Sequence, residues 1–211
     1  LVKNQPTTGA IVTNCNCTTM FLTMVLAPLH RHYGIDSVTV STMQAVSGAG
    51  YPGVASIDIL GNTFPLPLEE EKIESETLKI LGSLSVTGVD PASFPISAQC
   101  QRVPVAHGHT ETITIALKTE PDLSELTNTL SNFRGVPQDL DLHSAPISPI
   151  VVFEQNDRPQ PLLDIDLGAG MVTAVGRIRR CPVSSVKMLV MGNNLIRGAA
   201  GAAVLNAETL L

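Results

Sequence analysis

The stretch Asn-Cys-Asn-Cys-Thr-Thr at 14–19 contains the residues best suited to nucleophilic chemistry. The short apolar stretch 9–13 before it predicts a buried strand, and the apolar run 20–33, which stops at Gly34, predicts a helix. A thiol at a strand-to-helix junction lies near free backbone N–H groups and the positive end of the helix dipole, which both lower its pKa. The pattern predicts a nucleophilic cysteine. The alternative is that Cys15 and Cys17 are small buried hydrophobic residues.

The composition of the 211-residue chain restricts its class. The hydrophobic fraction of 44% is enough for a core, which must be aliphatic because aromatic residues make up only 3%. The net charge of −6, without any basic run, argues against nucleic-acid binding. No apolar run reaches the roughly 18 residues that span a bilayer, and no secretory signal is recognisable. We therefore expect a cytoplasmic protein with no nucleic-acid or membrane partner.

The four cysteines, at 15, 17, 100 and 181, match no zinc-binding template. Disulfide scaffolds are shorter and denser in cysteine than this chain. We therefore expect no metal site and free thiols in a reducing compartment.

Hydrophobic periodicity predicts strands interspersed with helices. Helices are predicted at 69–81, with an acidic first turn, at 122–133, with Asp122 as its cap, and from about 195 to the end. Strands are predicted at 36–46, 96–105, 111–118, 150–153, 171–180 and 185–191, the last two paired with each other. Loops are predicted at 47–53, 57–67, 83–95, 135–149 and 155–170. This order predicts an α+β fold with a mixed β-sheet.

Five motifs, in order, resemble those of the aspartate-β-semialdehyde dehydrogenase family. They are NCNCTT at 14–19, QAVSGAG at 44–50, EEEK at 69–72, Arg102 with His109 seven residues later, and NLIRGAAG at 194–201. The segments 158–161 and 197–201 are most similar to the fungal and archaeal branch. The resemblance implies a mixed sheet flanked by helices, as in the C-terminal catalytic domain of the glyceraldehyde-3-phosphate-dehydrogenase-like dehydrogenases.

The resemblance also implies a domain organisation. Residues 1–192 correspond to the catalytic, substrate-binding and dimerisation domain, and residues 193–211 to a C-terminal helix that packs on the cofactor domain. The glycine-rich turn of the family's NADP-binding domain is not found in this sequence, which also lacks an initiator methionine. We therefore expect a truncated chain in which most of the NADP site is missing, inactive alone as a dehydrogenase.

The family reduces aspartyl-β-phosphate with NADPH to aspartate semialdehyde and phosphate, a step towards lysine, methionine and threonine. The resemblance to this family also implies that the chain forms a homodimer or a dimer of dimers. The resemblance assigns Cys17, rather than Cys15, as the nucleophile that forms a thioester. His109 corresponds to the general acid/base, and only its spacing from Arg102 selects it over His107.

The remaining site residues follow from the same motifs. Gln44 corresponds to a residue that orients the acyl intermediate, and Asn16 to one whose amide helps to hold the oxyanion. Arg102 corresponds to the substrate carboxylate ligand, Glu69 to the amino-group ligand, Lys72 to the phosphate ligand and Asn194 to a nicotinamide contact. Without the motifs, a surface or structural role is favoured for His109, and a solvated acidic helix start for Glu69 and Lys72. The alternative for Arg102 is a solvated arginine at a strand end. Glu70 or Glu71 could take the place of Glu69.

Two other functions are compatible with the residues. A non-catalytic dimerisation or interaction module would keep the fold and lose the chemistry. A cysteine hydrolase could use Cys17 and His109, but it would leave Arg102 and Asn194 unexplained.

Overall fold

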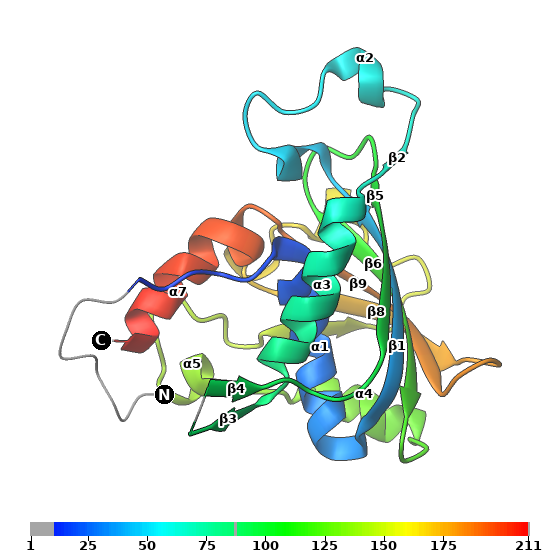
Figure 1. Ribbon diagram of the computed structural model, residues 1–211, viewed down its shortest axis with the longest axis vertical. Coiled ribbons are helices and arrows are strands. Elements are labelled where there is room, and N and C mark those ends of the chain that lie inside the picture. Colours follow the sequence, from blue (N-terminus) through cyan, green and yellow to red (C-terminus); the bar gives the residue numbers. More distant parts are fainter. Residues whose placement is uncertain (1–10, 87, 211) are drawn as a thin grey trace.

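The computed structural model describes residues 11–86 and 88–210 and is built on a seven-stranded mixed sheet (Figure 1). The strand order is β2 (Phe64–Pro65), β5 (Ile96–Arg102), β1 (Ile35–Gln44), β6 (His109–Leu117), β9 (Val186–Gly192), β8 (Thr173–Arg180) and β7 (Ile150–Phe153). The pairs β1–β5 and β7–β8 are parallel, and the other pairs are antiparallel. The predicted α+β fold with a mixed sheet is confirmed.

Three helices, α1 (Cys17–Tyr33), α3 (Pro67–Ile80) and α4 (Leu123–Ser131), pack on one side of the sheet (Figure 1). The chain ends in a π-helical turn, η3 (Ile196–Ala200), that continues into α7 (Gly201–Leu210). The shorter helical turns are η1 (Val46–Ala49), α2 (Ser56–Ile59), α5 (Val136–Asp139), α6 (Pro161–Asp164) and η2 (Leu167–Gly170). All the predicted long helices are present.

The core lies between α1 and the sheet. Phe21, Leu22 and Leu26 on α1 are fully buried, and they meet alternate strand residues such as Val40 and Ile113. Burying a side chain of this size stabilises the fold by about 1.5–3 kcal/mol. Packing against α1 therefore fixes the positions of the strand residues that point to this face of the sheet.

The start of α1 differs from the sequence prediction. Asn16 caps the helix, and Gly34, whose φ is +67°, ends it, as expected for a C-terminal glycine. The buried strand predicted at 9–13 is wrong where it can be tested: Ile11 and Val12 are irregular and exposed, while positions 9 and 10 lie outside the described residues. No strand of the described sheet pairs with this apolar segment.

Other boundaries shift for local reasons. β1 stops at Gln44 and turns into η1, and β5 stops at Arg102, two residues before Pro104, which cannot donate to a ladder. β6 starts two residues earlier than predicted because His109 pairs with Gly192. The predicted loop 83–95 contains a small hairpin of β3 (Ser83–Ser85) and β4 (Gly88–Asp90), and the other predicted loops contain the short helical turns.

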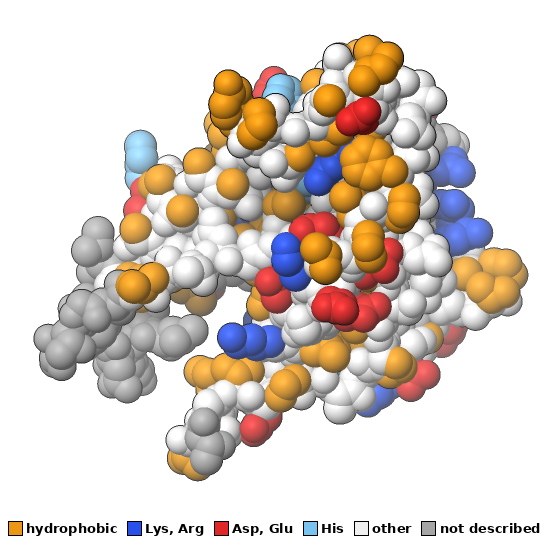
Figure 2. Space-filling view, turned by 45° about the horizontal axis from the view of Figure 1, so that its top comes forward, with side chains coloured by type: hydrophobic (Ala, Val, Ile, Leu, Met, Phe, Trp, Pro, Cys, Tyr) orange, Lys and Arg blue, Asp and Glu red, His pale blue; other side chains and the backbone are white. Residues whose placement is uncertain are grey.

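The surface is mixed in polarity. Figure 2 shows hydrophobic side chains near the top of the molecule, and Figure 1 places α2 at the top. In and beside α2, Tyr51, Ile57 and Leu60 are exposed. Acidic side chains gather in the middle of the same view. No helix within residues 11–86 and 88–210 is long and apolar enough to cross a membrane.

Candidate active site

Three buried side chains of the site come from adjacent strands of the sheet. Gln44 on β1 is the register partner of Arg102 on β5. On the other side of β1, Met43 is paired with Thr110 of β6, and Gln44 and His109 are the next residues of these two antiparallel strands. Paired residues point to the same face of a sheet. All three are at most 6% exposed, although each is polar. The structure therefore brings together three of the residues that the sequence singled out.

Cys17 is the first residue of α1, the helix that covers this face. The side-chain oxygen of Asn16 accepts hydrogen bonds from the N–H groups of Thr18 (2.9 Å) and Thr19 (3.3 Å). Gly198 of η3 lies against the other side of Cys17, because a Cβ atom at position 198 would be 2.7 Å from the Cys17 Cβ. Cys17 is thus held between the helix cap and the C-terminal segment.

The electrostatics of Cys17 contradict the sequence prediction of a lowered pKa. Burial raises the pKa of the Cys17 thiol; a hydrogen bond with Thr18 opposes this, and the charge of Glu69 adds to the increase. The N–H groups of Thr18 and Thr19, which could have stabilised a thiolate, are already bound to Asn16. Cys17 is therefore a thiol in the resting chain, and the helix terminus alone does not activate it.

His109 and Arg102 are both anchored on the backbone of Ala45. The Ala45 N–H donates to His109 Nδ1 at 3.0 Å, and Arg102 Nη1 donates to the Ala45 carbonyl at 2.7 Å. Neither His109 Nε2 nor Arg102 Nε has a partner among the described residues. Burial, with a contribution from the Arg102 charge, lowers the pKa of His109 to about 3. Two buried donors therefore remain free for a ligand.

Gly48 of η1 closes this part of the site. A Cβ atom at position 48 would lie 2.8 Å from Arg102 Nη1 and 2.9 Å from His109 Nε2. Only a residue without a side chain allows the backbone to approach both groups this closely. Gly48 was part of a sequence motif, but this contact was not predicted.

Glu69 and Lys72 lie near the cap of the Cys17 helix. Asn16 Nδ2 donates to Glu69 Oε2 at 2.5 Å, and Lys72 Nζ donates to Glu69 Oε1 at 2.8 Å. Glu70 instead accepts the N–H of Cys100, and Glu71 is exposed. Of the three glutamates, Glu69 is therefore the one that contacts the Asn16 cap, and its role towards a substrate stays a prediction. The amide of Asn16 is occupied by these contacts, and its predicted oxyanion role stays a prediction.

Asn194 connects two loops of the site. Its Oδ1 accepts the N–H of Gly108 at 2.9 Å, and its Nδ2 donates to Ser47 Oγ at 2.9 Å. Gly108 precedes His109, and Ser47 precedes Gly48. His107, the other candidate histidine, is exposed. The structure thus separates the two histidines and assigns Asn194 a structural contact beside His109.

Glu111, two residues after His109 on β6, is a buried residue of the site that no sequence motif indicated. Glu111 is fully buried, and neither of its carboxyl oxygens has a partner among the described residues. Burial raises the pKa of Glu111 well above its ordinary value, so the neutral acid is favoured. Strand alternation from His109 would have placed Glu111 on the same face, which is the signal that could have identified it.

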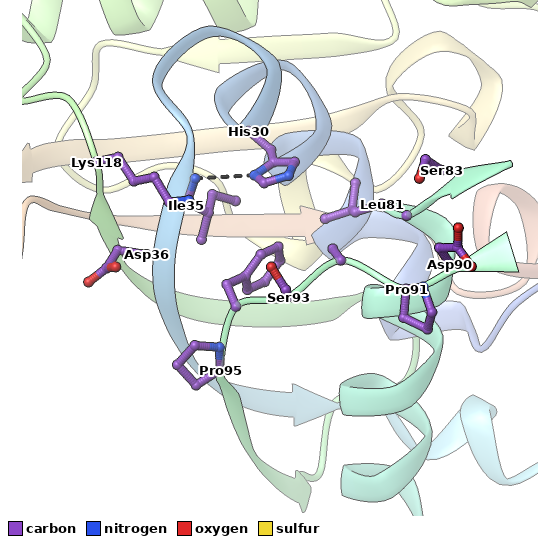
Figure 3. Close-up of a pocket in the computed structure, with 13 residues that line it drawn as sticks. His30, Ile35, Asp36, Leu81, Ser83, Asp90, Pro91, Ser93, Pro95 and Lys118 are labelled. Carbon is purple, nitrogen blue, oxygen red and sulfur yellow. Dashed lines mark hydrogen bonds between the residues drawn. The ribbon is translucent and has the colours of Figure 1, made fainter. Parts of the chain in front are cut away.

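The residues of the site are distinct from a cavity of about 450 Å³ lined by His30, Asp36 and Lys118 (Figure 3). There His30 Nδ1 accepts the N–H of Ile35, and the His30 ring packs against Phe94. Ile35 and Gln44 are the two ends of β1, a separation of roughly 30 Å for a ten-residue strand. This cavity therefore lies far from Cys17 and His109.

The comparisons with known proteins identify similar chains. A family model described as "Semialdehyde dehydrogenase, dimerisation domain" matches residues 26–197. The chain is 51% identical over 205 residues to an aspartate-semialdehyde dehydrogenase of Methanothermobacter thermautotrophicus, a match that covers 96% of this chain and 59% of the relative. The corresponding protein of Saccharomyces cerevisiae is 43% identical, with 99% and 60% covered. The chain thus spans about three fifths of the length of these relatives.

Solved structures agree with these matches. The structure of aspartate semialdehyde dehydrogenase with NADP from Candida albicans has a TM-score of 0.84 and 42% identity, covering 92% of this chain and 56% of that one. A second enzyme, from Vibrio cholerae and complexed with ASA, has a TM-score of 0.76 and 26% identity, covering 95% and 62%.

Proposed function

The chain belongs to the semialdehyde dehydrogenase family, and on that premise we propose that it is the catalytic and dimerisation part of an aspartate-semialdehyde dehydrogenase. The reaction is the reductive dephosphorylation of aspartyl-β-phosphate to aspartate semialdehyde and phosphate, in the cytoplasm and with NADPH as reductant. It is a step in the synthesis of the aspartate-derived amino acids.

One observation carries this proposal. The thiol at the start of α1 lies close enough to Arg102 for their charges to interact, and Arg102 and His109 each have a buried nitrogen with no partner within residues 11–86 and 88–210. Buried polar groups are rarely left without a partner unless a ligand or solvent supplies one. A substrate that carries a carboxylate and an acyl oxygen would satisfy both donors.

The charged side chains have complementary roles towards such a substrate. Arg102, whose guanidinium is anchored by Ala45, binds the α-carboxylate. Glu69 binds the α-amino group of the substrate. Lys72, whose side chain is 53% exposed, binds its phosphate. The ion pair between Glu69 and Lys72 keeps both in place before the substrate arrives, and it raises the pKa of Lys72 through its hydrogen bond.

The covalent step begins at Cys17. Its S–H bond breaks, the sulfur bonds to the acyl carbon, and the bond from that carbon to the phosphate oxygen breaks. The proton from the thiol ends on the departing phosphate, so the charges balance. Because the resting thiol has a raised pKa, its ionisation depends on the substrate and on the nearby cations Arg102 and Lys72. Gln44 orients the resulting thioester.

NADPH, when bound, supplies the hydride that converts the thioester to the aldehyde. The residues of this chain fit that cofactor only in part. Asn194, the expected nicotinamide contact, already uses its oxygen for Gly108 and one N–H for Ser47, which leaves one N–H. The sequence also has no GxGxxG or phosphate-loop motif. We therefore propose that the isolated chain does not complete the reduction.

A homodimer is the proposed assembly. The helices α1, α3 and α4 pack on one side of the sheet (Figure 1). Met43 and Leu189, which alternate with buried strand residues and so point to the other side, are half-buried. A second copy of the chain would cover this open side. Light scattering should report the mass of two chains, and the mass of one chain would contradict the dimer.

The thioester step can be tested on the chain itself. The protein is mixed with aspartyl-β-phosphate, and intact mass and released phosphate are measured. We expect one aspartyl adduct and one phosphate per chain, and neither in Cys17→Ser. Continuous phosphate release without an adduct would indicate a hydrolase. The absence of both, in a folded protein, would indicate a non-catalytic module.

A further inference from the structure

Glu111 lies between the polar site and the apolar core. On β6 it stands two residues after His109 and two residues before Ile113, which packs against α1. Alternate residues of a strand point to the same face, roughly 7 Å apart. Glu111 is paired with Thr42 of β1 and with Val190 of β9, and both of these partners are buried. The carboxyl group is therefore on the face of the sheet that α1 covers.

The carboxyl group of Glu111 has no partner there. It is fully buried, and neither of its oxygens forms a hydrogen bond within residues 11–86 and 88–210. The hydroxyl of the neighbouring Thr42 already accepts a hydrogen bond from Gln44 Nε2 at 3.4 Å. A buried carboxyl group costs stability when it bonds to nothing, so packing alone does not explain its presence.

The ionisable side chains of this region are Cys17 on α1, Glu69 and Lys72 on α3, Cys100 and Arg102 on β5, and His109 on β6 itself. Glu111 is close enough to Cys17 and Cys100 for a charge on its carboxyl group to act on both thiols. No cation among the described residues binds its oxygens, and burial raises the pKa of Glu111. The carboxyl group is therefore neutral, and it carries an O–H donor beside the nucleophile.

We propose that Glu111 is a hydrogen-bond donor to the sulfur of Cys17, and that its neutral carboxylic acid stabilises the negative charge on the sulfur during acylation. This rests on the proposed function and deepens it. The O–H bond of Glu111 does not break, so Glu111 keeps its proton throughout. In the resting chain the thiol is neutral and no hydrogen bond joins the two groups. We expect the bond to form as the sulfur becomes negative, because donors bind charged acceptors more strongly than neutral ones.

Alkylation of Cys17 tests the sign of this interaction without any substrate. The protein is treated with iodoacetamide at a series of pH values, and peptide mapping follows Cys17 separately from Cys15. Glu111→Gln keeps a neutral donor, whereas Glu111→Met keeps the length of the side chain without a donor. We expect Glu111→Met to raise the pKa of the Cys17 thiol by about 1, and Glu111→Gln to change it much less. Exposed Glu125→Met is the control.

The other outcomes of this experiment overturn the proposal. If Glu111 were ionised, both variants would lower the pKa of the Cys17 thiol, because each removes a negative charge. If neither variant changed the pH profile, the carboxyl group would have a structural role only.

Infrared spectra provide a measurement that does not depend on the folding of Glu111→Met. The difference between the spectra of the wild type and Glu111→Gln at neutral pH should contain the band of a protonated carboxylic acid. A carboxylate band in its place would overturn the proposal.

Acylation by aspartyl-β-phosphate separates failure of this inference from failure of the proposed function. The rate should fall on the order of 10-fold in Glu111→Met and much less in Glu111→Gln. If the wild-type chain is not acylated at all, the proposed function is wrong, and alkylation and infrared spectra still decide the role of Glu111. If the wild type is acylated and both variants react faster, the proposed function stands and this inference is wrong.

Discussion

Asn194 donates a hydrogen bond of 2.9 Å to the hydroxyl of Ser47, a residue 147 positions earlier in the chain. The same amide accepts the N–H of Gly108. The final segment of the chain therefore holds both loops beside His109 before any ligand is bound.

The first prediction concerns this link. Ser47→Ala should lower the free energy of unfolding by about 1 kcal/mol, and Asn194→Ala by roughly 2–3 kcal/mol, because the latter also leaves the buried Gly108 N–H without a partner. The double variant should be no less stable than Asn194→Ala within about 0.5 kcal/mol. Urea unfolding measures all three, and simple additivity of the two losses would contradict the link.

The second prediction concerns Gly48. Gly48→Ala should reduce Cys17 acylation strongly while changing stability little, because its Cβ would displace the ends of Arg102 and His109. Gly135→Ala is a matched control, since its Cβ would make only ordinary contacts 3.4 Å from Gln138. Acylation rates and unfolding are measured in parallel. An unchanged acylation rate in Gly48→Ala would show that the close approach has no role.

The third prediction separates the three consecutive glutamates. Glu69→Gln should weaken substrate binding by about 1.5–3 kcal/mol, because it removes the charge that binds Lys72 and that we propose binds the amino group of the substrate. Exposed Glu71→Gln should behave as the wild type. The dependence of acylation on substrate concentration distinguishes them. If both variants behave alike, Glu69 has no special place in the site.

The fourth prediction concerns Glu111. Burial raises its pKa in the folded chain, so at neutral pH the folded state holds a proton that the unfolded state releases. The cost of keeping Glu111 protonated opposes folding at pH values above the ordinary carboxyl pKa, and it disappears below that pKa. Glu111→Gln should therefore be more stable than the wild type at neutral pH, and the gain should shrink in acid.

Unfolding of Glu111→Gln and the wild type at several pH values checks this sign. Glu125→Gln, whose carboxyl group on α4 is exposed, provides the control. A stability difference that grew as the pH fell would contradict a neutral Glu111.

The sequence predicted the framework of this fold better than its electrostatics. Periodicity located the helices at 69–81 and 122–133, because their apolar faces and caps are local signals. The strand prediction failed at 11–13, because β-branched residues form a strand only where a partner strand is available. Burial of Cys17 was only the alternative reading of the sequence, and its close contact with Gly198, which is distant in the sequence, could not be predicted.

The site residues show the same division. Motif spacing predicted Cys17, Arg102 and His109 as site residues, but the partner of His109 is a backbone N–H that no motif encodes. The hydrogen bond between Asn16 and Glu69 likewise depends on how α3 packs against the start of α1. These contacts depend on how separate elements meet, and periodicity describes each element alone.

The most direct test of the central claim is peptide mapping of the chain after reaction with aspartyl-β-phosphate. We expect one aspartyl thioester, located on Cys17 and absent from Cys15, together with release of one phosphate. An adduct on Cys15, or a folded chain that forms no adduct at all, would contradict it.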